Sequence, residues 1–370
     1  MSSDCLQLRA APKALVLLII SLMLISCAAQ PLHQDLLNDK KHFLLEGGDL
    51  TLESSRYPQA VQAKLHYLGV GGVMLEMDGR RILTAPFYSN PPFLNNIPGI
   101  PLHRKTQRID KLFPPSLYDV NSAPDLRIQA ILAGHSHYDH LLDVPYLMQN
   151  YLQEAKLIGS ETAVAIINNQ LDLGCVPNGP RAQIARENRW LNVGNDIYVY
   201  TIPSTHAPHT GFLHYTAQTG KYHCVDPLRI RTAWDWKMGD VYAYLVDFRD
   251  PSGKILLRMY YQDSASSPSS GKIPASVLAE HPVDIAVVVL AGFSKVDDYP
   301  ESVIANTEAT LTVVGHWEDF FQKFGERPSV ARGSDQLEFI GRLKAKINGE
   351  HYWAMTLPGK ILNLNFVPPK

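Results

Sequence analysis

Four ionisable side chains crowd six consecutive residues, His-Ser-His-Tyr-Asp-His, directly after an apolar segment at 128–132. Imidazoles and carboxylates this close together repel one another or must be desolvated at a cost, unless a cation pairs with them. Residues two apart in an extended chain face the same way, so His135 and His137 can share one ion while Asp139 and His140 turn to a second. A lone His is usually an ordinary core or surface residue, but this cluster predicts metal binding.

Three further candidate ligands also come at the ends of predicted strands. Short runs rich in β-branched and aromatic residues predict strands at 64–68, 73–77, 81–83, 128–132, 156–158, 197–202, 242–248, 254–261, 284–290 and 311–314. His206, Asp263 and His316 follow the strands that end at 202, 261 and 314. Ligands at strand ends meet at one edge of a sheet, where a rigid scaffold can hold a site.

Turn and capping residues predict several of the connections. Asp78-Gly79 predicts a hairpin turn with positive φ, and Ser160 begins a helix that runs to Asn169. Asp143 begins another helix, and its carboxylate either caps that helix, which we favour, or orients a metal-binding His. The Pro-rich, non-periodic residues 88–125 are expected to form a long loop, which in a compact domain is usually either functional or disordered.

Several His and aromatic residues outside the cluster have two interpretations. His209 is either a pocket acid or substrate contact, or a solvated loop residue. The segment 211–240 is expected to be a lid or pocket wall rather than surface packing, and it contains His214, His223, Trp234 and Trp236. The helical spacing of Trp317, Phe320 and Phe321 predicts core residues rather than a substrate platform.

The cluster and the order of the residues after it resemble the metallo-β-lactamase superfamily. The run from His135 to Asp143 is similar to the HxHxDH signature of that family, and His206, Asp263 and His316 follow in the family's order. The resemblance extends from about residue 64 to about residue 325. It implies an α/β fold, a four-layer αββα sandwich of two mixed sheets, within a hydrolase domain at 61–370.

The resemblance also implies a role for each ligand. The first metal ion would be held by His135, His137 and His206, and the second by Asp139, His140 and His316, with Asp263 bridging the two. Asp263 and Asp139 are the candidate catalytic residues. We expect two divalent ions, Zn²⁺ first and iron or manganese as alternatives, because His and Asp donors accept all three metals. Two ions about 3.5–4 Å apart can hold a bridging hydroxide, which is a strong nucleophile.

Within the superfamily, the chain is most similar to the phosphodiesterase-like and lactonase-like branch, which includes bacterial relatives of N-acyl-phosphatidylethanolamine phospholipase D. This implies hydrolysis of an ester-type bond, and the best candidate is a phosphodiester or phospholipid-like substrate. The alternatives are a lactonase or β-lactamase, or a surface lipoprotein that binds a ligand without turnover. Two positions depart from the family pattern: Thr84 lies near Pro86 where an Asp commonly precedes the Pro, and Gln262 precedes Asp263 where Gly is usual. Neither departure removes a ligand.

The N-terminus has the pattern of a bacterial lipoprotein signal. Arg9 and Lys13 precede an apolar run at 14–25, shorter than the roughly 20 residues that span a bilayer, which predicts a signal peptide at 1–26. The sequence ending in Cys27 resembles a lipobox, in which that cysteine is lipidated; the alternative is an uncleaved anchor with an incidental cysteine. Ala28 favours the outer membrane, facing the periplasm, and residues 27–60 are expected to be a tether and N-terminal extension.

Composition restricts the partners. With 34 Lys and Arg against 36 Asp and Glu, the chain lacks the basic surplus typical of nucleic-acid binding. We therefore expect a small-molecule or lipid-like substrate, and contact with a membrane through the lipid anchor. After removal of the signal peptide and lipidation of Cys27, Cys175 and Cys224 remain, and the sequence leaves open whether they pair in an oxidising periplasm.

Overall fold

The computed structural model describes residues 30–33, 45–84, 86–113, 127–174, 176, 178–209, 218–323, 326 and 328–370. The predicted signal peptide, Cys27, Cys175 and His214 lie outside these residues, so the predictions made for them stay predictions. Within the described part of the chain, no helix is both long and apolar enough to cross a membrane.

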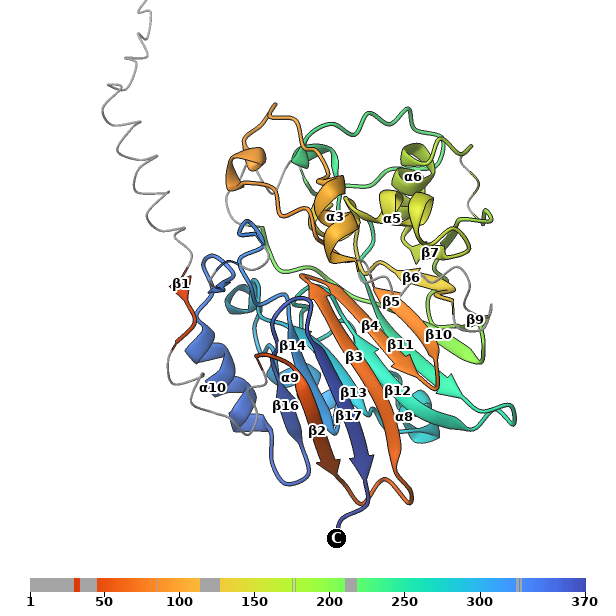
Figure 1. Ribbon diagram of the computed structural model, residues 1–370, viewed down its shortest axis with the longest axis vertical. Helices are drawn as coiled ribbons and strands as arrows, with labels where there is room; N and C mark the ends of the chain where they lie inside the picture. The colour runs from red at the N-terminus through yellow and green to blue at the C-terminus, as the bar shows by residue number, and fades with distance from the viewer. Residues whose placement is uncertain are drawn as a thin grey trace, which may run out of the picture.

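Two mixed β-sheets form the centre of the molecule (Figure 1). The larger sheet contains, in spatial order, β2 (Gly48–Glu53), β17 (Ile361–Val367), β3 (Val61–Gly69), β4 (Gly72–Met77), β5 (Arg80–Thr84), β6 (Ala130–Leu132), β7 (Lys156–Gly159) and β8 (Ala182–Ile184). The smaller sheet contains β16 (Tyr352–Ala354), β14 (Leu311–Gly315), β13 (Ile285–Val289), β12 (Ile255–Tyr261), β11 (Tyr242–Arg249), β10 (Ile197–Pro203) and β9 (Trp190–Gly194). All ten predicted strands are present.

Alternating side chains of the larger sheet bury its two faces in different layers. Leu65, Leu75 and Leu132 pack against the smaller sheet, whereas Met74 and Ile131 point the other way. That second face is covered by α3 (Thr106–Leu112), α5 (Val144–Asn150) and α6 (Glu161–Gln170). The smaller sheet is covered on its outer face by α8 (Ala275–Glu280), α9 (Glu301–Thr307) and α10 (Gln336–Lys346). The result is the αββα sandwich that the sequence predicted.

The predicted turn and helix start are confirmed in detail. Asp78 and Gly79, between β4 and β5, have φ values of 51° and 78°. Ser160 caps α6, its Oγ accepting a hydrogen bond from the Ala163 amide at 3.2 Å. These signals are local, since each depends on residues within a few positions of one another.

Three segments differ from the sequence-based description. β2 lies inside 27–60, expected to be a tether and N-terminal extension; it belongs to the folded domain and pairs in parallel with β17, at the edge of the larger sheet. The expected loop 88–125 contains η1 (Phe93–Asn96) and α3, whose Ile109 is buried under the larger sheet. Residues 317–319 are not helical, because their backbone pairs with residues 329–331.

A buried ion pair stabilises the strands that lead to the candidate site. Arg258 of β12 donates from Nε and Nη2 to Asp247 of β11 at 2.7 and 2.9 Å, and from Nη1 to the carbonyls of Val277 and His281. We expect Arg258→Met to lower the free energy of unfolding by about 3 kcal/mol, because Asp247 stays buried with less countercharge. Arg342→Met, in a partly exposed pair with Glu301, should cost less than about 1 kcal/mol. Equal losses in urea unfolding would contradict this assignment.

A buried His gives the fold a defined pH dependence. His66 of β3 is 7% exposed, and burial lowers its pKa to about 4. The unfolded chain, with a His pKa of about 6.5, binds more protons than the folded chain between about pH 6.5 and 4, so stability falls as the pH drops through that window. We expect His66→Gln to flatten this part of the profile of unfolding free energy against pH. His103→Gln, at an exposed position, is the control, and identical slopes for both variants would refute the assignment.

Candidate metal centre

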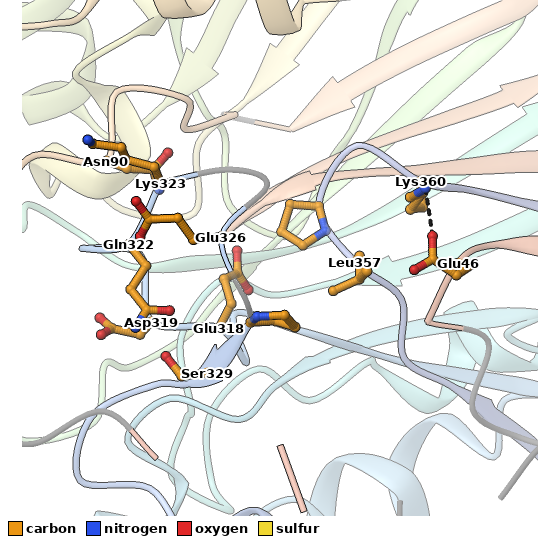
Figure 2. A pocket seen from close by; sticks show the side chains of 12 residues that line it. Glu46, Asn90, Glu318, Asp319, Gln322, Lys323, Glu326, Ser329, Leu357 and Lys360 are labelled. Carbon is orange, nitrogen blue, oxygen red and sulfur yellow. Dashed lines mark ion pairs between the residues drawn. The ribbon is translucent and has the colours of Figure 1, made fainter. Parts of the chain in front are cut away.

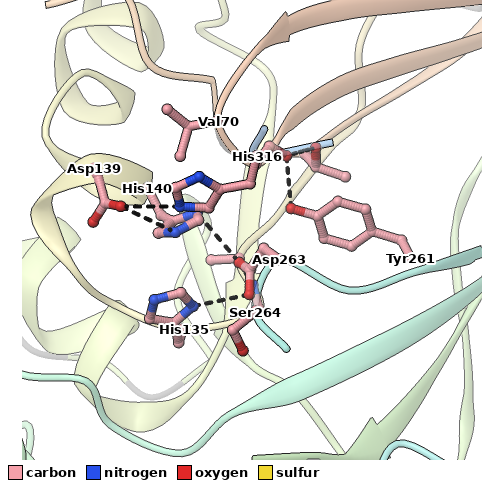
Figure 3. Close-up of polar contacts among 12 residues, drawn as sticks. Val70, His135, Asp139, His140, Tyr261, Asp263, Ser264 and His316 are labelled. Atoms are coloured by element: carbon pink, nitrogen blue, oxygen red, sulfur yellow. Dashed lines mark hydrogen bonds and ion pairs between the residues drawn. The ribbon is translucent and has the colours of Figure 1, made fainter. Parts of the chain in front are cut away.

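The seven residues predicted as metal ligands lie together where strands of both sheets end. Figure 3 shows five of them, His135, Asp139, His140, Asp263 and His316. The cluster follows β6, and the other three ligands follow β10, β12 and β14. The ligand atoms form three groups, and within each group they lie within 4.8 Å of one another: His135, His137 and His206; His135, His140 and Asp263; Asp139, His140 and His316.

The spacing in the last of these groups suits a shared ion. Asp139 Oδ2 lies 3.4 Å from His316 Nε2 and 3.5 Å from His140 Nε2. Two donors that are each about 2.1 Å from one tetrahedral ion lie about 3.4 Å apart, whereas N–H···O hydrogen bonds are typically about 2.7–3.2 Å. These three side chains therefore have the separation of co-ligands.

Asp263 lies between the two predicted ligand sets. Its Oδ1 accepts a hydrogen bond from His135 Nδ1 at 2.8 Å, and its Oδ2 accepts one from the Gly134 amide at 2.9 Å. The same Oδ2 is 3.5 Å from His140 Nδ1. Because His135 and His140 belong to different predicted sets, the carboxylate of Asp263 contacts Nδ1 of one His from each set.

The buried polar atoms of the site also fit a metal centre. His135 Nε2, His137 Nε2, both ring nitrogens of His140 and His316 Nδ1 are buried without a hydrogen-bond partner. A buried polar group left unsatisfied costs about 1–3 kcal/mol, so several in one place are unfavourable unless a ligand satisfies them. Cations coordinated by Nε2 of His135, His137 and His140 would satisfy three of these atoms.

The protonation states favour cations as well. Burial, with help from His135, lowers the pKa values of His137 and His206 well below the usual range, and burial lowers the pKa of His140 to about 4. Burial acts to raise the pKa of Asp263, yet the neighbouring imidazoles bring it down to about 2. Burial acts to lower the pKa of His135 as well, but Asp263 raises it above its usual value. His137, His140 and His206 are therefore neutral beside ionised carboxylates, which are the forms that bind metal ions.

Two glycines make room for the ligands. A Cβ on Gly134 would lie 2.3–2.6 Å from the carboxylate of Asp263, and a Cβ on Gly71 would lie 2.6 Å from His140 Nδ1. A Cβ atom essentially never comes this close to an atom to which it is not bonded. Each glycine therefore lets a ligand approach the backbone closely.

The second ligand set is also held by residues that sequence reasoning missed. Val70 has a φ of 53°, unusual for a β-branched residue. Its carbonyl accepts a hydrogen bond from the His316 amide at 3.0 Å, and its amide donates to Glu318 Oε1 at 2.6 Å. Tyr67 donates its hydroxyl to the other oxygen of Glu318. These partners are about 250 positions apart, so no local pattern could have revealed them.

The two departures from the family pattern have structural roles here. Thr84 Oγ1 donates to the Gly71 carbonyl at 2.5 Å and accepts from the Val73 amide at 2.7 Å, which fixes the turn beside His140. Gln262 is buried; its Oε1 accepts from the Tyr260 hydroxyl and its Nε2 donates to the Tyr299 hydroxyl. Both side chains support the backbone next to a ligand.

The favoured role of Asp143 was wrong. It occupies the N-cap position of α5, but its side chain makes no capping hydrogen bond. Its carboxylate accepts instead from the amides of Tyr88 and Ser89, at 2.7 and 2.8 Å, and from the Ser89 hydroxyl. Asp143 therefore fixes the start of the long segment after β5 to the helix that follows the metal motif.

Two other predicted residues lie against the ligands. The ring of His209 stacks on that of His206, with centroids 4.9 Å apart, and lies 5.0 Å from the ring of His137. Phe320, predicted to be core, is only partly buried, and its ring is 5.5 Å from His316. Trp317 is fully buried as predicted.

The long segments at 86–113 and 218–240 meet beside the metal motif. The Met238 carbonyl accepts a hydrogen bond from the Ser136 amide, and Trp234 Nε1 donates to the Asn96 carbonyl at 2.7 Å. Tyr138 of the motif donates to Asn96 Oδ1. The described part of 211–240 is thus a wall beside the site, and Trp236 within it is buried.

A separate pocket of about 410 Å³ contains none of the seven candidate ligands (Figure 2). Half of its twelve lining residues are charged, among them Glu318, Asp319, Lys323 and Glu326. It lies beside the backbone that follows His316.

The sequence matches no protein-family model and no curated protein. Among solved structures, the chain is similar to the metallo hydrolase Igni18 from Ignicoccus hospitalis, with 15% identity and a TM-score of 0.47 over 82% of this chain and 98% of that one. It is also similar to the metallo-β-lactamase fold protein YhfI from Bacillus subtilis, with 11% identity and a TM-score of 0.44 over 82% and 99% of the two chains. It is similar as well to an isothiocyanate hydrolase from Delia radicum gut bacteria, with 13% identity and a TM-score of 0.45 over 81% of this chain and 98% of that one.

The close approach at Gly134 leads to a direct test. We expect Gly134→Ala to lower metal affinity by about 10–100-fold, because its Cβ displaces the carboxylate of Asp263. Gly341→Ala, in α10 with nothing within 4 Å of the added Cβ, should retain wild-type affinity. Competition with a chromogenic chelator measures both. Equal affinities in the two variants would show that Asp263 does not hold the metal.

Proposed function

We propose that this protein is a binuclear metal-dependent hydrolase that cleaves an ester-type bond, with a phosphodiester or phospholipid-like substrate as the best candidate. One observation carries the proposal: two sets of buried donors, each suited to one ion, meet at Asp263. We propose Zn²⁺ as the ion, because nitrogen-rich His donors with carboxylates suit it well; iron and manganese suit the same donors.

Two divalent ions held by these residues would supply Lewis acidity and a water of lowered pKa near neutral pH. The chain's own contribution is orientation. The hydrogen bond from His135 Nδ1 to Asp263 turns His135 Nε2 to the donor set, and the bond from His206 Nδ1 to the Ala207 carbonyl, at 2.6 Å, does the same for His206 Nε2. Asp263 and Asp139, both ionised, provide the negative charge that holds the cations in place.

Aromatic side chains beside the second ligand set support a substrate with an apolar part. Phe320 lies against His316, and its ring is 4.4 Å from that of Phe321 and 6.0 Å from that of Phe87. Phe93 of η1 packs edge-on against Phe321 at 5.1 Å. A hydrolase of small polar substrates has no need of such a surface next to a ligand, whereas an ester with an acyl or alkyl group can bury against it.

We also propose that Cys27 is lipidated and holds the enzyme on the outer membrane, facing the periplasm. The disulfide-bonded state of Cys224 supports an oxidising compartment, since disulfides persist there and are rare in the cytosol. The near balance of charge supports a lipid-like or small-molecule substrate over nucleic acid.

The proposal is tested by assaying the purified protein on bis(4-nitrophenyl) phosphate, a lactone and a chromogenic cephalosporin. We expect turnover of the phosphodiester, its loss on chelation and its recovery with added zinc or manganese. Asp263→Asn should lower turnover at least about 100-fold, because it removes the charge between the two donor sets. Asp250→Asn, in the exposed β11–β12 turn, should leave turnover unchanged.

Each alternative function predicts a different outcome of the same assay. Turnover of the cephalosporin or the lactone alone would replace the phosphodiesterase proposal with a β-lactamase or lactonase. Fewer than about one metal ion per chain, with no hydrolysis after zinc or manganese is added, would indicate a ligand-binding lipoprotein without activity.

A further inference from the structure

The chain is held to the folded domain almost immediately after the predicted lipidation site. β1 (Gln30–Pro31) pairs antiparallel with β15 (Ser329–Val330), and Gln336 Nε2 donates to the Pro31 carbonyl at 3.1 Å. Gln30 is three residues from Cys27, and three residues span at most about 11 Å. A free tether through residue 60 would instead reach more than about 100 Å.

β15 connects this anchored strand to the metal centre. Its other side pairs with residues 317–319: the Asp319 amide donates to the Ser329 carbonyl at 2.8 Å, and the Ala331 amide donates to the Trp317 carbonyl at 2.7 Å. Neighbouring strands lie about 4.8 Å apart, so two such steps separate Gln30 from Glu318 by about 10 Å. His316 therefore lies within about 30 Å of Cys27 along this path.

Two exposed apolar side chains lie near the same part of the molecule. Leu94 of η1 is 60% exposed and Ile97, directly after η1, is 48% exposed. The segment is joined to the strands just described through Arg332, whose guanidinium lies over the rings of Phe93 and Phe321 at 4.7 and 5.2 Å. On its other side, η1 contacts the metal motif through the hydrogen bond between Asn96 and Tyr138. Leu94 and Ile97 thus belong to a segment that links the anchored strands to the metal motif.

We propose that a lipid bilayer covers this anchored face, defined here by its exposed residues: Gln30 and Pro31 of β1, Leu94 of η1, and Ile97 directly after η1. The inference rests on lipidation of Cys27, which is part of the proposed function, and adds to it an orientation. The short connection to Cys27 holds the face against the headgroups, and Leu94 and Ile97 enter the interface to a depth of roughly 5–10 Å. The aromatic side of the metal centre then faces the membrane and receives its substrate from the lipid phase.

The orientation is tested with the full-length lipidated protein in vesicles of phosphatidylethanolamine and phosphatidylglycerol that carry a lipid-borne quencher. A fluorophore is attached to Leu94→Cys, to Ile97→Cys and, as control, to Ile361→Cys, an apolar β17 residue with 39% exposure. Labelling without reductant leaves the disulfide of Cys224 intact. We expect quenching at least about threefold stronger at 94 and 97 than at 361, as interfacial insertion requires. Equal quenching at all three positions overturns the proposal.

Lengthening the connection between Cys27 and β1 tests separately whether the protein is anchored to the membrane and whether it is oriented on it. Inserting about a dozen Gly and Ser residues between Ala29 and Gln30 adds a flexible segment of roughly 20 Å and leaves both Cys27 and β1 unchanged. We expect the protein to stay on the vesicles while quenching at 94 and 97 falls towards the control value. Turnover of a vesicle-embedded phosphodiester should fall several-fold, and turnover of bis(4-nitrophenyl) phosphate should not change. Undiminished quenching after the insertion would show that the short connection does not set the orientation.

The outcomes distinguish this inference from the proposed function. Mass analysis of the N-terminal peptide reports the lipid on Cys27, and its absence overturns both the anchor and the orientation. Position-dependent quenching without hydrolysis of any substrate supports the orientation and overturns the hydrolase proposal alone. Hydrolysis together with equal quenching at all three positions supports the hydrolase proposal and overturns the orientation alone.

Discussion

The carboxylate of Asp263 is buried where the two sheets meet, and the groups around it determine what this edge of the sandwich can bind. Asp263 extends from β12 of the smaller sheet to the Gly134 amide and to His135, which follow β6 of the larger sheet. Nearby, the Tyr242 amide donates to the Gly134 carbonyl at 2.7 Å, and the Tyr261 hydroxyl donates to the Gly71 carbonyl at 2.6 Å. These bonds join the sheets at the site. A buried charge of this kind is costly without nearby positive charge, so the same contacts that close the sandwich also favour cations there.

The backbone next to the ligands is less relaxed than ordinary loops. Val70 and His316 both have left-handed φ values, 53° and 44°, and they are bonded to each other through the His316 amide. Such conformations cost of order 1–3 kcal/mol each and persist where surrounding contacts over-determine them. Here the buried side chain of Glu318, held by Tyr67 and the Val70 amide, provides that support. The strained residues, Val70 and His316, therefore lie where they position His316, a ligand of the second set.

What could be predicted from the sequence follows the range of each interaction. Strands with apolar runs, the Asp78-Gly79 turn and the Ser160 cap depend on near neighbours, and the structure confirms them. β17 alternates buried and exposed residues along its length, yet its place between β2 and β3 joins segments some 300 positions apart. Asp143 has the sequence signature of a cap, but the amides of Tyr88 and Ser89 compete for its carboxylate. Aromatic spacing after His316 suggested a helix, and pairing with residues 329–331 prevented one.

The two ligand sets differ in what holds them. His135, His137 and His206 follow β6 and β10, which pair with a neighbour on each side, so the cores against those strands fix their backbone. His316 also follows a strand, but the chain beyond it enters the short pairing with β15, which in turn carries β1. The second set is thus continuous with the N-terminal segment, and the first is not. The contacts that hold residues 30–31 in place therefore also influence the side of the metal centre where Phe320 lies against His316. This is the side on which an apolar substrate would bind.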